Sequence, residues 1–566
     1  MSYFNIILFA FLLYWLLVRF LDKRGTLGKY NITTYGPVLM VRTQKGQLFL
    51  DKLATQKGFW RGFANLGLPA MLIGMAVMFL LILFIDYAMI MSFQTGTVPP
   101  PSKFNEPRNI FLIPGVNEYI PLWYGIIALI ITLMVHEFSH AILCKVEGIK
   151  VKSMGLLLAP IPIGGFAEPD EEQLLGKVEE KSEAQKETTS IEPKKLATRS
   201  ERVRVLTAGV MANFVTAMIA FILFFLLLGS LSPVGDVIVT GVIPGSAADQ
   251  AGVIPDMILT GINDTPVNDA HDFLIHARTL QPGTSVSLDF VDKGVRKKID
   301  LVAVSGNQTS EGVRVFKIVE GSPAEAAGIK PDMVLVRIDG TEIKVLDDFV
   351  SFMNSTRPGQ KLDISLMSDN SSNATLLVFN DIELSIYPYD KDAKKGFLGI
   401  SYSPEEGATS YSMGLTVGYF PAKNYLHVLK SIPSMLNQVS GWLLLFSLPI
   451  FGLTGEGFPG FSGIITNFYE PTGWAVSLGA GIYIMLNILM WIGWMNFYVG
   501  LFNCLPAVPL DGGHVFRDVM SSSLSRIIGN GDKVEKISNA IVIIFALMIL
   551  FSLLFVTFAP FAAQVI

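Results

Sequence analysis

Apolar residues gather in six long runs along the chain, at residues 2–20, 64–92, 121–144, 203–229, 474–502 and 537–559. Each run approaches or exceeds the ~20 residues that an α-helix needs to cross the ~30 Å hydrocarbon core of a bilayer. The first run lacks a basic start and a small-residue cleavage site, so we expect a retained helix rather than a signal peptide. The pattern predicts a polytopic α-helical membrane protein with about six spans.

Basic residues set the expected orientation of these helices, because loops rich in lysine and arginine stay in the cytoplasm. Residues 21–63 carry eight such residues, whereas residues 93–120 carry only Lys103 and Arg108. The run 203–229 is preceded by arginines, so it should start on the cytoplasmic side and end outside. The long stretch that follows it, about 231–425, is therefore expected to be extracytoplasmic.

Two apolar segments do not fit a simple crossing. Segment 154–168, MGLLLAPIPIGGFAE, is short and is interrupted by two prolines and by Gly164 and Gly165. A re-entrant hairpin fits it best, and a loop at the membrane surface is the alternative. Segment 434–453 is long enough to span, but both of its neighbours are expected to lie outside. We therefore expect an interfacial or re-entrant segment, or a crossing reversed within 454–473.

The extracytoplasmic stretch contains an internal repeat. GSAADQAGVIPDMIL (245–259) recurs as GSPAEAAGIKPDMVL (321–335) at an offset of 76, and the same offset pairs Phe273 with Phe349. Such a repeat predicts two copies of one folded unit. Each copy resembles the PDZ fold, and GFLGI (396–400) resembles the strand and loop that close the second copy. PDZ domains bind extended peptides at a sheet edge, although two packing modules would give the same pattern.

Composition narrows the range of functions. The 566 residues are 51% hydrophobic and 16% charged, with a net charge of −5, so a nucleic-acid partner is not expected. The two cysteines, Cys144 and Cys504, lie in apolar segments, which argues against a disulfide framework. The expected surroundings of this chain are a lipid bilayer.

The run 121–144 contains three ionisable residues in the motif His136-Glu137-Phe138-Ser139-His140. Ionisable groups at membrane depth are costly, so they are functional by default. The two histidines are four residues apart and share one helix face, about 6 Å from each other. They can hold one Zn²⁺, which lowers the pKa of a bound water to about 7, and Glu137 can take the proton.

A third metal ligand is needed, and Asp511 in NCLPAVPLDGG (503–513) is the candidate. An aspartate beside glycine is often only a turn or cap residue. However, the run 474–502 enters from outside and would deliver Asp511 to the depth of His136. Cys144 continues the histidine face, but its Cα would lie about 12 Å along the axis from that of His136. We therefore expect Cys144 in the core.

HEFSH and NCLPAVPLDGG, with PDZ-like repeats between them, resemble the site-2 protease family of intramembrane zinc metalloproteases, in its archaeal form. TAGVMANF (207–214) and GGFAEPDEEQL (164–174) also resemble segments of that family. The resemblance implies His136, His140 and Asp511 as zinc ligands and Glu137 as the catalytic residue. It implies substrate-binding roles for five more residues: Asn503, Pro506, Asn213, Gly164 and Gly165.

The function implied by this resemblance is zinc-dependent cleavage of transmembrane segments in regulated intramembrane proteolysis. The substrate would be a membrane protein already trimmed by another protease, and the PDZ-like domains would gate or bind it. The active site would lie towards the cytoplasmic side of the cell membrane. Two alternatives are a catalytically silent zinc-binding scaffold and a transporter, but the inverted helical repeats typical of a transporter are not evident.

The expected domain organisation follows from these patterns. N-terminal helices and a basic loop occupy 1–120, and the two halves of the membrane protease core occupy 121–230 and 474–566. The two PDZ-like α+β domains are expected at 231–310 and 311–403, followed by a linker and interfacial segment at 404–473.

Overall fold

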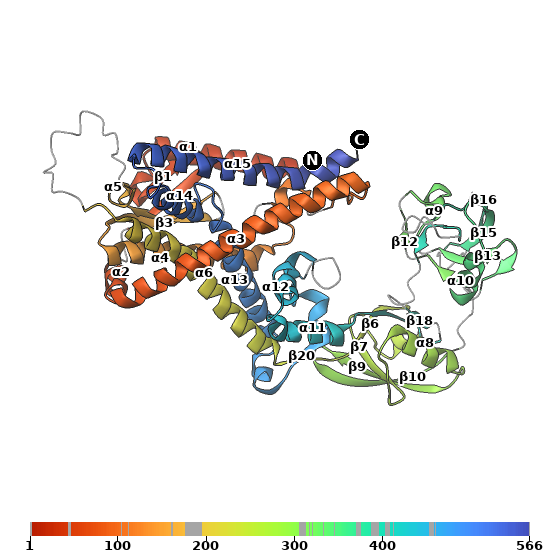
Figure 1. Cartoon of the computed structure of the whole chain (residues 1–566). Helices are drawn as coiled ribbons and strands as arrows, with labels where there is room; N and C mark the ends of the chain where they lie inside the picture. Colours follow the sequence, from red (N-terminus) through yellow and green to blue (C-terminus); the bar gives the residue numbers. More distant parts are fainter. Residues whose placement is uncertain are drawn as a thin grey trace. The chain divides into compact units, whose positions relative to one another are not determined.

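The computed structural model of the chain describes residues 3–43, 47–102, 105–110, 112–159, 162–175, 195–304, 313–315, 317–319, 321–331, 333–343, 346–368, 375–386, 395–401, 408–410, 412–451, 458 and 460–564 (Figure 1). The chain divides into two compact units. The first, here called the helical unit, consists of Met1–Gly229, Ile432–Phe461 and Leu478–Ile566. The second, here called the β-rich unit, consists of Ser230–Ser431 and Ser462–Ser477.

Five helices of the helical unit are long and apolar enough to cross a membrane: α3 (Lys57–Thr95), α4 (Leu122–Glu147), α6 (Arg199–Leu228), α13 (Gly481–Asn503) and α15 (Gly531–Ala563). They coincide with five of the six predicted runs, which confirms the prediction of a multi-pass helical membrane protein. The first run forms helix α1 (Tyr3–Lys23). A total of six spans stays a prediction.

Helix α6 is the centre of the helical unit and packs against α3, α4 and α13. Small residues allow these helices to approach closely, as is common in membrane bundles. A Cβ atom on Gly67 of α3 would lie 2.9 Å from the Thr207 carbonyl oxygen of α6. A Cβ atom on Gly493 of α13 would lie 2.7 Å from the ring of Phe221. Any larger residue at these two glycines would push the helices apart.

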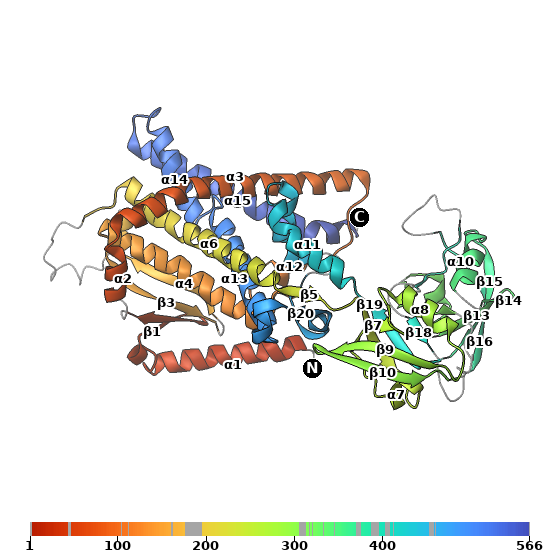
Figure 2. The same cartoon turned by 90° about the horizontal axis from the view of Figure 1, so that it is seen from below.

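A four-stranded antiparallel sheet lies beside α4 (Figure 2). Its strands, in order, are β1 (Ile32–Tyr35), β2 (Val38–Thr43), β3 (Val151–Leu158) and β4 (Pro162–Pro169). Segment 154–168 is thus a β-hairpin, and the loop 21–63 supplies two further strands to it. Strand β4 is at one edge of this sheet and packs against α4. A re-entrant position of the hairpin in the membrane stays a prediction.

Buried ion pairs join the ends of the helices. The Glu147 carboxylate at the end of α4 is fully buried and pairs with Arg61 of α3 at 2.9 Å and with Arg204 of α6 at 2.7 Å. Arg202 of α6 makes two hydrogen bonds to Asp518, at 3.0 and 3.1 Å. Asp518 lies in α14 (Asp511–Leu524). Removing one partner of a largely buried pair costs about 3–5 kcal/mol, which applies to Arg204–Glu147 and Arg202–Asp518 but not to Arg61, whose side chain is 47% exposed.

Segment 434–453 forms the end of α11 (Ala422–Met435) and helix α12 (Val439–Phe451). With 13 residues, α12 is shorter than the ~20 residues that a crossing needs. Its length agrees with the expectation that this segment makes no simple span. Residues 452–457, where a reversal of the chain was expected to begin, lie outside the described residues, so the path stays a prediction.

The two sequence repeats fold into the same series of elements in the β-rich unit. The first repeat comprises β6 (Val237–Val242), α7 (Ala247–Gln250), β7 (Ile258–Ile262), β8 (Thr265–Pro266), α8 (Ala270–Thr279), β9 (Ser285–Asp292) and β10 (Val295–Val302). The second comprises β11 (Val313–Arg314), β12 (Lys317–Ile318), α9 (Pro323–Ala326), β13 (Val334–Ile338), β14 (Thr341–Glu342), α10 (Leu346–Asn354), β15 (Lys361–Met367), β16 (Leu376–Glu383) and β17 (Ile400–Ser401). Each repeat has its own core, around Phe273 in the first and Phe349 in the second.

The structure differs from the tandem order of the two predicted domains. The first repeat is completed by β18 (Ala408–Ser410) and β19 (Leu415–Tyr419), which follow the second repeat in the chain. Strand β19 pairs with β6, and Leu415 and Val417 are fully buried in the core of the first repeat. The second repeat is therefore inserted within the first, and β18 and β19, which lie in the expected linker 404–473, belong to the first repeat. The limit at 310 lies outside the described residues and stays a prediction.

The remaining elements are short. They are α2 (Gln47–Ala54), α5 (Glu171–Leu175), the paired strands β5 (Leu231–Pro233) and β20 (Tyr469–Pro471), and the 3₁₀ turns Gly28–Tyr30, Pro107–Asn109, Gly463–Phe468 and Gly473–Leu478.

Candidate active site

Helix α4 carries three of the predicted site residues on consecutive turns. His136 and His140 are one turn apart, and their ring centroids are 4.7 Å from each other. The helix has no proline, so its geometry is regular and the i, i+4 spacing places both rings on one face. His136 is buried and His140 is largely buried. This is the arrangement that the sequence predicts.

Asp511 is the first residue of α14, and the two glycines after it fix its position. A Cβ atom on Gly512 would collide with the carbonyl group of Cys504, and one on Gly513 would lie 2.5 Å from the carbonyl carbon of Ala507. Only glycine therefore lets the first turn of α14 rest on the segment that follows α13. The two glycines of the DGG motif are thus required by this close contact. The contact fixes the start of α14, where the Asp511 carboxylate faces α4.

Three donor atoms meet between α4 and α14. Asp511 Oδ2 lies 3.2 Å from Nε2 of His136 and 3.2 Å from Nε2 of His140, and the two nitrogens are 3.1 Å apart. Tetrahedral zinc with bonds of about 2.0–2.2 Å would place its ligands about 3.3–3.6 Å apart. Asp511 Oδ2 is buried and makes no hydrogen bond to the described residues. The size of this triangle and its orphaned oxygen fit a single small cation.

The outer nitrogens of both imidazoles have partners on α6. His140 Nδ1 lies 2.7 Å from the Val205 carbonyl oxygen, so Nδ1–H donates and Nε2 keeps its lone pair. His136 Nδ1 lies 3.1 Å from the side-chain amide of Asn213, whose Oδ1 is buried and unsatisfied. Exchanging the amide oxygen and nitrogen lets His136 Nδ1–H donate to Oδ1. Both Nε2 atoms are then available to one cation.

Helix α6 comes close to the rings because of Gly209. A Cβ atom at this position would lie 2.5 Å from His140 Nε2 and 2.8 Å from His136 Cε1. The two histidines therefore rest directly on the backbone of α6. Gly209 lies within the segment TAGVMANF, so a family resemblance could have pointed to it, whereas the Val205 carbonyl has no side-chain signal in the sequence.

Glu137 faces the edge strand β4. The backbone N–H of Ala167 donates to Glu137 Oε2 at 2.6 Å. The next residue, Glu168, accepts from Arg42 of β2 at 2.5 Å and from the Ser153 hydroxyl of β3. The Arg42 guanidinium also lies over the Phe166 ring, 5.7 Å from its centroid. The N-terminal loop thus supports the strand that contacts Glu137, a link that the sequence analysis missed.

The predicted substrate-binding residues lie at several places around the donor atoms. Asn503 is half-buried and donates to the Val499 carbonyl of its own helix at 3.0 Å, and Pro506 is buried in the turn after α13. Gly164 and Gly165 are in β4, opposite Leu157 and Leu156. Their substrate contacts stay predictions.

Asn213 is fully buried against His136, so its side chain is placed to support a candidate ligand. A contact of Asn213 with substrate stays a prediction.

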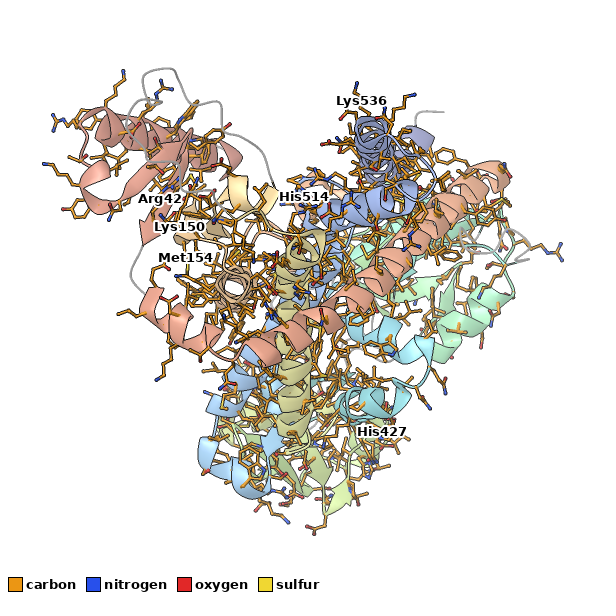
Figure 3. All side chains as sticks on the ribbon, turned by 60° about the vertical axis from the view of Figure 1, so that its left-hand side comes forward. Arg42, Lys150, Met154, His427, His514 and Lys536 are labelled. Atoms are coloured by element: carbon orange, nitrogen blue, oxygen red, sulfur yellow. The ribbon has the colours of Figure 1, made fainter. Side chains whose placement is uncertain are left out.

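The other histidines and Cys144 do not join the donor cluster, which among the described residues consists of His136, His140 and Asp511. His514 lies in the same turn of α14 as Asp511 (Figure 3). His427 is exposed, and His276 bonds to a carbonyl of its own helix. Cys144 is buried in an apolar cluster, as expected.

These features define a multi-pass membrane protein with a two-histidine, one-carboxylate candidate metal site beside a glutamate. The model of peptidase family M50 matches residues 124–549. The chain therefore belongs to this family, which is the site-2 protease family and comprises zinc metalloproteases. The resemblance seen in the sequence is confirmed.

Individual relatives agree with the family. The chain is similar to the regulator of sigma E protease of Haemophilus influenzae, with 22% identity over 430 residues, covering 69% of this chain and 88% of the relative. It is similar to a putative zinc metalloprotease of Neisseria meningitidis, with 24% identity and the same coverage of both chains. It is also similar to an uncharacterized protein of Methanocaldococcus jannaschii, with 29% identity over 287 residues, covering 50% of this chain and 68% of the relative.

Proposed function

We propose that this protein is a zinc-dependent endopeptidase that cleaves transmembrane segments of membrane proteins in regulated intramembrane proteolysis. The observation that carries the proposal is the triangle of donor atoms on His136, His140 and Asp511, with Glu137 beside it on a helix long enough to span a bilayer. A hydrolytic site on a membrane-spanning helix is useful only for a substrate that is itself in the membrane.

Each residue has a distinct role in this proposal. His136, His140 and Asp511 would hold the zinc ion, which supplies Lewis acidity and an acidified water when it is bound. The Val205 carbonyl and Asn213 orient the two rings. Glu137 takes the proton from the attacking water and passes it to the leaving amine. The hydrogen bond from Ala167 N–H to Oε2 fixes the orientation of the Glu137 carboxylate.

The substrate helix must unwind before cleavage, because helical carbonyl groups are engaged in intrahelical bonds. We propose that the unwound segment pairs with the edge of β4, which lies against α4 and reaches Glu137 through Ala167. Gly164 and Gly165 would allow close approach of the substrate backbone to this strand. Asn503 and Pro506 would contact the substrate on the α13 side.

The two repeats would act as extracytoplasmic PDZ-like domains that bind or exclude substrate ends. Support comes from their matched series of strands and helices, each with its own core. Edge pairing with an extended peptide is the usual mode of binding in PDZ domains. Substrates would reach the site after another protease has trimmed them, because a bulky outer domain would not pass these two units.

The test compares metal content with cleavage in purified protein, in detergent, with a model transmembrane substrate. Glu137→Gln keeps the size and the acceptor of the side chain but cannot take the proton. It should keep zinc and lose about 10²–10⁴-fold or more in rate. His140→Ala should lose zinc and cleavage together. A Glu137→Gln protein that cuts normally would refute the assignment of the base.

The alternative of a silent zinc-binding scaffold makes a different prediction. The scaffold would hold zinc through the same three donors and would cut no substrate, with or without a chelator. Chelator-sensitive cleavage of even one transmembrane substrate would exclude it.

A further inference from the structure

The first repeat of the β-rich unit carries a short edge strand, β18, on its closing strand β19. In the first repeat the sheet order ends β6-β19-β18, so β18 covers the outer edge of β19. In the second repeat the matching strand, β17, pairs with β12 alone among the described residues. The positions of the second repeat that would match β18, 393–395, lie mostly outside the described residues, and the additional strand is described for the first repeat alone.

The equivalence of the two closing strands rests on matching hydrogen bonds. Ala248 N–H donates to Met413 O and Ala324 N–H to Leu398 O, both at 2.9 Å. The glycines that follow, Gly414 and Gly399, have φ angles of 79° and 85°. In each repeat the glycine packs against the serine that caps the first short helix, so that a Cβ atom would collide with it. Gly414 and Gly399 thus occupy the same position in the module.

Strand β18 lies where an added peptide strand would lie. It runs antiparallel to β19, with Ala408 opposite Val417 and Ser410 opposite Leu415. Helix α8 packs against both β18 and β19, so β18 is placed between this helix and the sheet edge. Ser410 is buried. An extended segment between a helix and the edge of a sheet is the arrangement of β-augmentation.

A backbone donor of the first repeat is engaged by β18 at this position. Gly414 N–H donates to the Ser410 carbonyl oxygen at 2.7 Å. Gly399 N–H makes no hydrogen bond to any described residue. A glycine N–H in a tight turn at a strand start is suited to an anionic acceptor, such as the terminal carboxylate of a peptide. The chain's own carbonyl takes that donor in the first repeat.

We propose that β18 is a built-in occupant of a peptide-binding groove between β19 and α8, and that it competes with an extended peptide that ends in a free carboxylate. This rests on the proposed peptide-binding role of the repeats and adds their regulation. The outer edge of β19 in the first repeat is covered by the protein's own chain. A tethered occupant acts at an effective concentration on the order of millimolar, so an external peptide binds the groove of the first repeat only when β18 is displaced.

The test uses the full chain in detergent and a fluorescein-labelled peptide with the sequence of residues 405–410, EEGATS, ending in a free carboxylate. Thr409→Pro removes a backbone donor and disfavours the strand. It should lower the Kd of the peptide at least tenfold, measured by fluorescence anisotropy. Thr409→Val keeps the strand and should bind like the wild type. The amidated peptide should bind at least tenfold more weakly to Thr409→Pro.

A second variant tests the same groove without weakening the strand. Thr409 and Thr416 face each other across β18 and β19, so cysteines at both positions can form a cross-strand disulfide. The oxidised protein should bind the peptide at least tenfold more weakly than its reduced form. The two native cysteines are buried.

The outcomes separate this proposal from the peptide-binding role on which it rests. Equal Kd values for the wild type, Thr409→Pro and both redox forms of the double cysteine variant would overturn the competition by β18 and keep a peptide site. Absence of binding to all four would overturn the peptide site itself. Neither result depends on protease activity.

Discussion

The residues that would hold the candidate metal all come from one region of the helical unit, whereas part of the support for their helices comes from another. The region matched by the family, 124–549, contributes His136, His140, Asp511 and Glu137. The region before it contributes none of these donors. Yet it supplies two strands of the sheet behind Glu137, the helix α3 and the Arg61 partner of Glu147.

The difference between these regions shows which contacts a short motif can encode. Metal ligands depend on side-chain chemistry at fixed spacing, so few other residues can replace them. Support depends on packing and backbone pairing, which many sequences can provide. We therefore expect substitutions in the matched region to change metal binding and chemistry, and substitutions in the N-terminal region to change position and stability.

The largest expected effect is that of Asp511→Ala, which leaves two imidazoles and no charged ligand. Zinc affinity should fall by more than the ~10–100-fold expected when only the hydrogen-bond partner of a zinc ligand is removed. Asp511→Asn should be intermediate, because a neutral oxygen coordinates weakly. Zinc content after dialysis, measured beside cleavage rate, checks both variants. An Asp511→Ala protein that holds zinc as tightly as the wild type would show that the site is assigned wrongly.

The next effect is that of Asn213→Ala, which removes the side-chain partner of His136 Nδ1. Zinc affinity should fall about 10–100-fold, because the ring loses its fixed orientation. Asn496→Ala is a matched control, since Asn496 is also fully buried but donates to the Ile492 carbonyl of its own helix. It should lower stability and leave zinc affinity unchanged. Equal zinc affinity in both variants would refute the role of Asn213.

The candidate site could be predicted from the sequence only in part. The spacing of His136 and His140 and the expected depth of Asp511 were sufficient to predict that the three side chains meet. Each motif carries its ligand residues within a few positions, so a short stretch of sequence reveals them. The Val205 carbonyl and the Ala167 N–H could not be predicted, since every residue has such groups. Strand β19 was missed because its partner β6 lies on the other side of an inserted repeat, and no local pattern reports so distant a pairing.

A smaller effect is expected at Gly74 of α3, in the N-terminal region. A Cβ atom there would lie 2.8 Å from Cys504 Sγ, in the turn that leads to Asp511. Gly74→Ala should therefore destabilise the protein by about 1–3 kcal/mol, as overpacking does. Gly62→Ala is the control, because nothing lies within 4 Å of its Cβ position. It should gain up to about 1 kcal/mol from helix propensity. Thermal unfolding in detergent measures both.

The two glycine variants also test whether α3 supports the metal site. Met71 and Met75 of α3 pack with Cys504 and Val515, on either side of Asp511 in the sequence. A displaced α3 should therefore weaken zinc binding in Gly74→Ala and not in Gly62→Ala. Unchanged zinc affinity in a destabilised Gly74→Ala protein would limit the role of α3 to stability.

The smallest effect is expected for Arg42→Gln. The ion pair of Arg42 with Glu168 is about one-third exposed on both sides, and such pairs contribute about 0–1 kcal/mol to stability. The melting temperature and the zinc content should therefore stay close to those of the wild type.

If β4 holds the substrate strand, however, loosening its partner should raise KM and leave kcat almost unchanged. The loss in kcat/KM should be up to roughly fivefold, since 1.36 kcal/mol corresponds to a factor of ten. Lys29→Gln, at an exposed position in the same loop, should change neither constant. A loss in kcat at constant KM would instead place the effect of Arg42 on Glu137, through the Ala167 N–H that bonds to it.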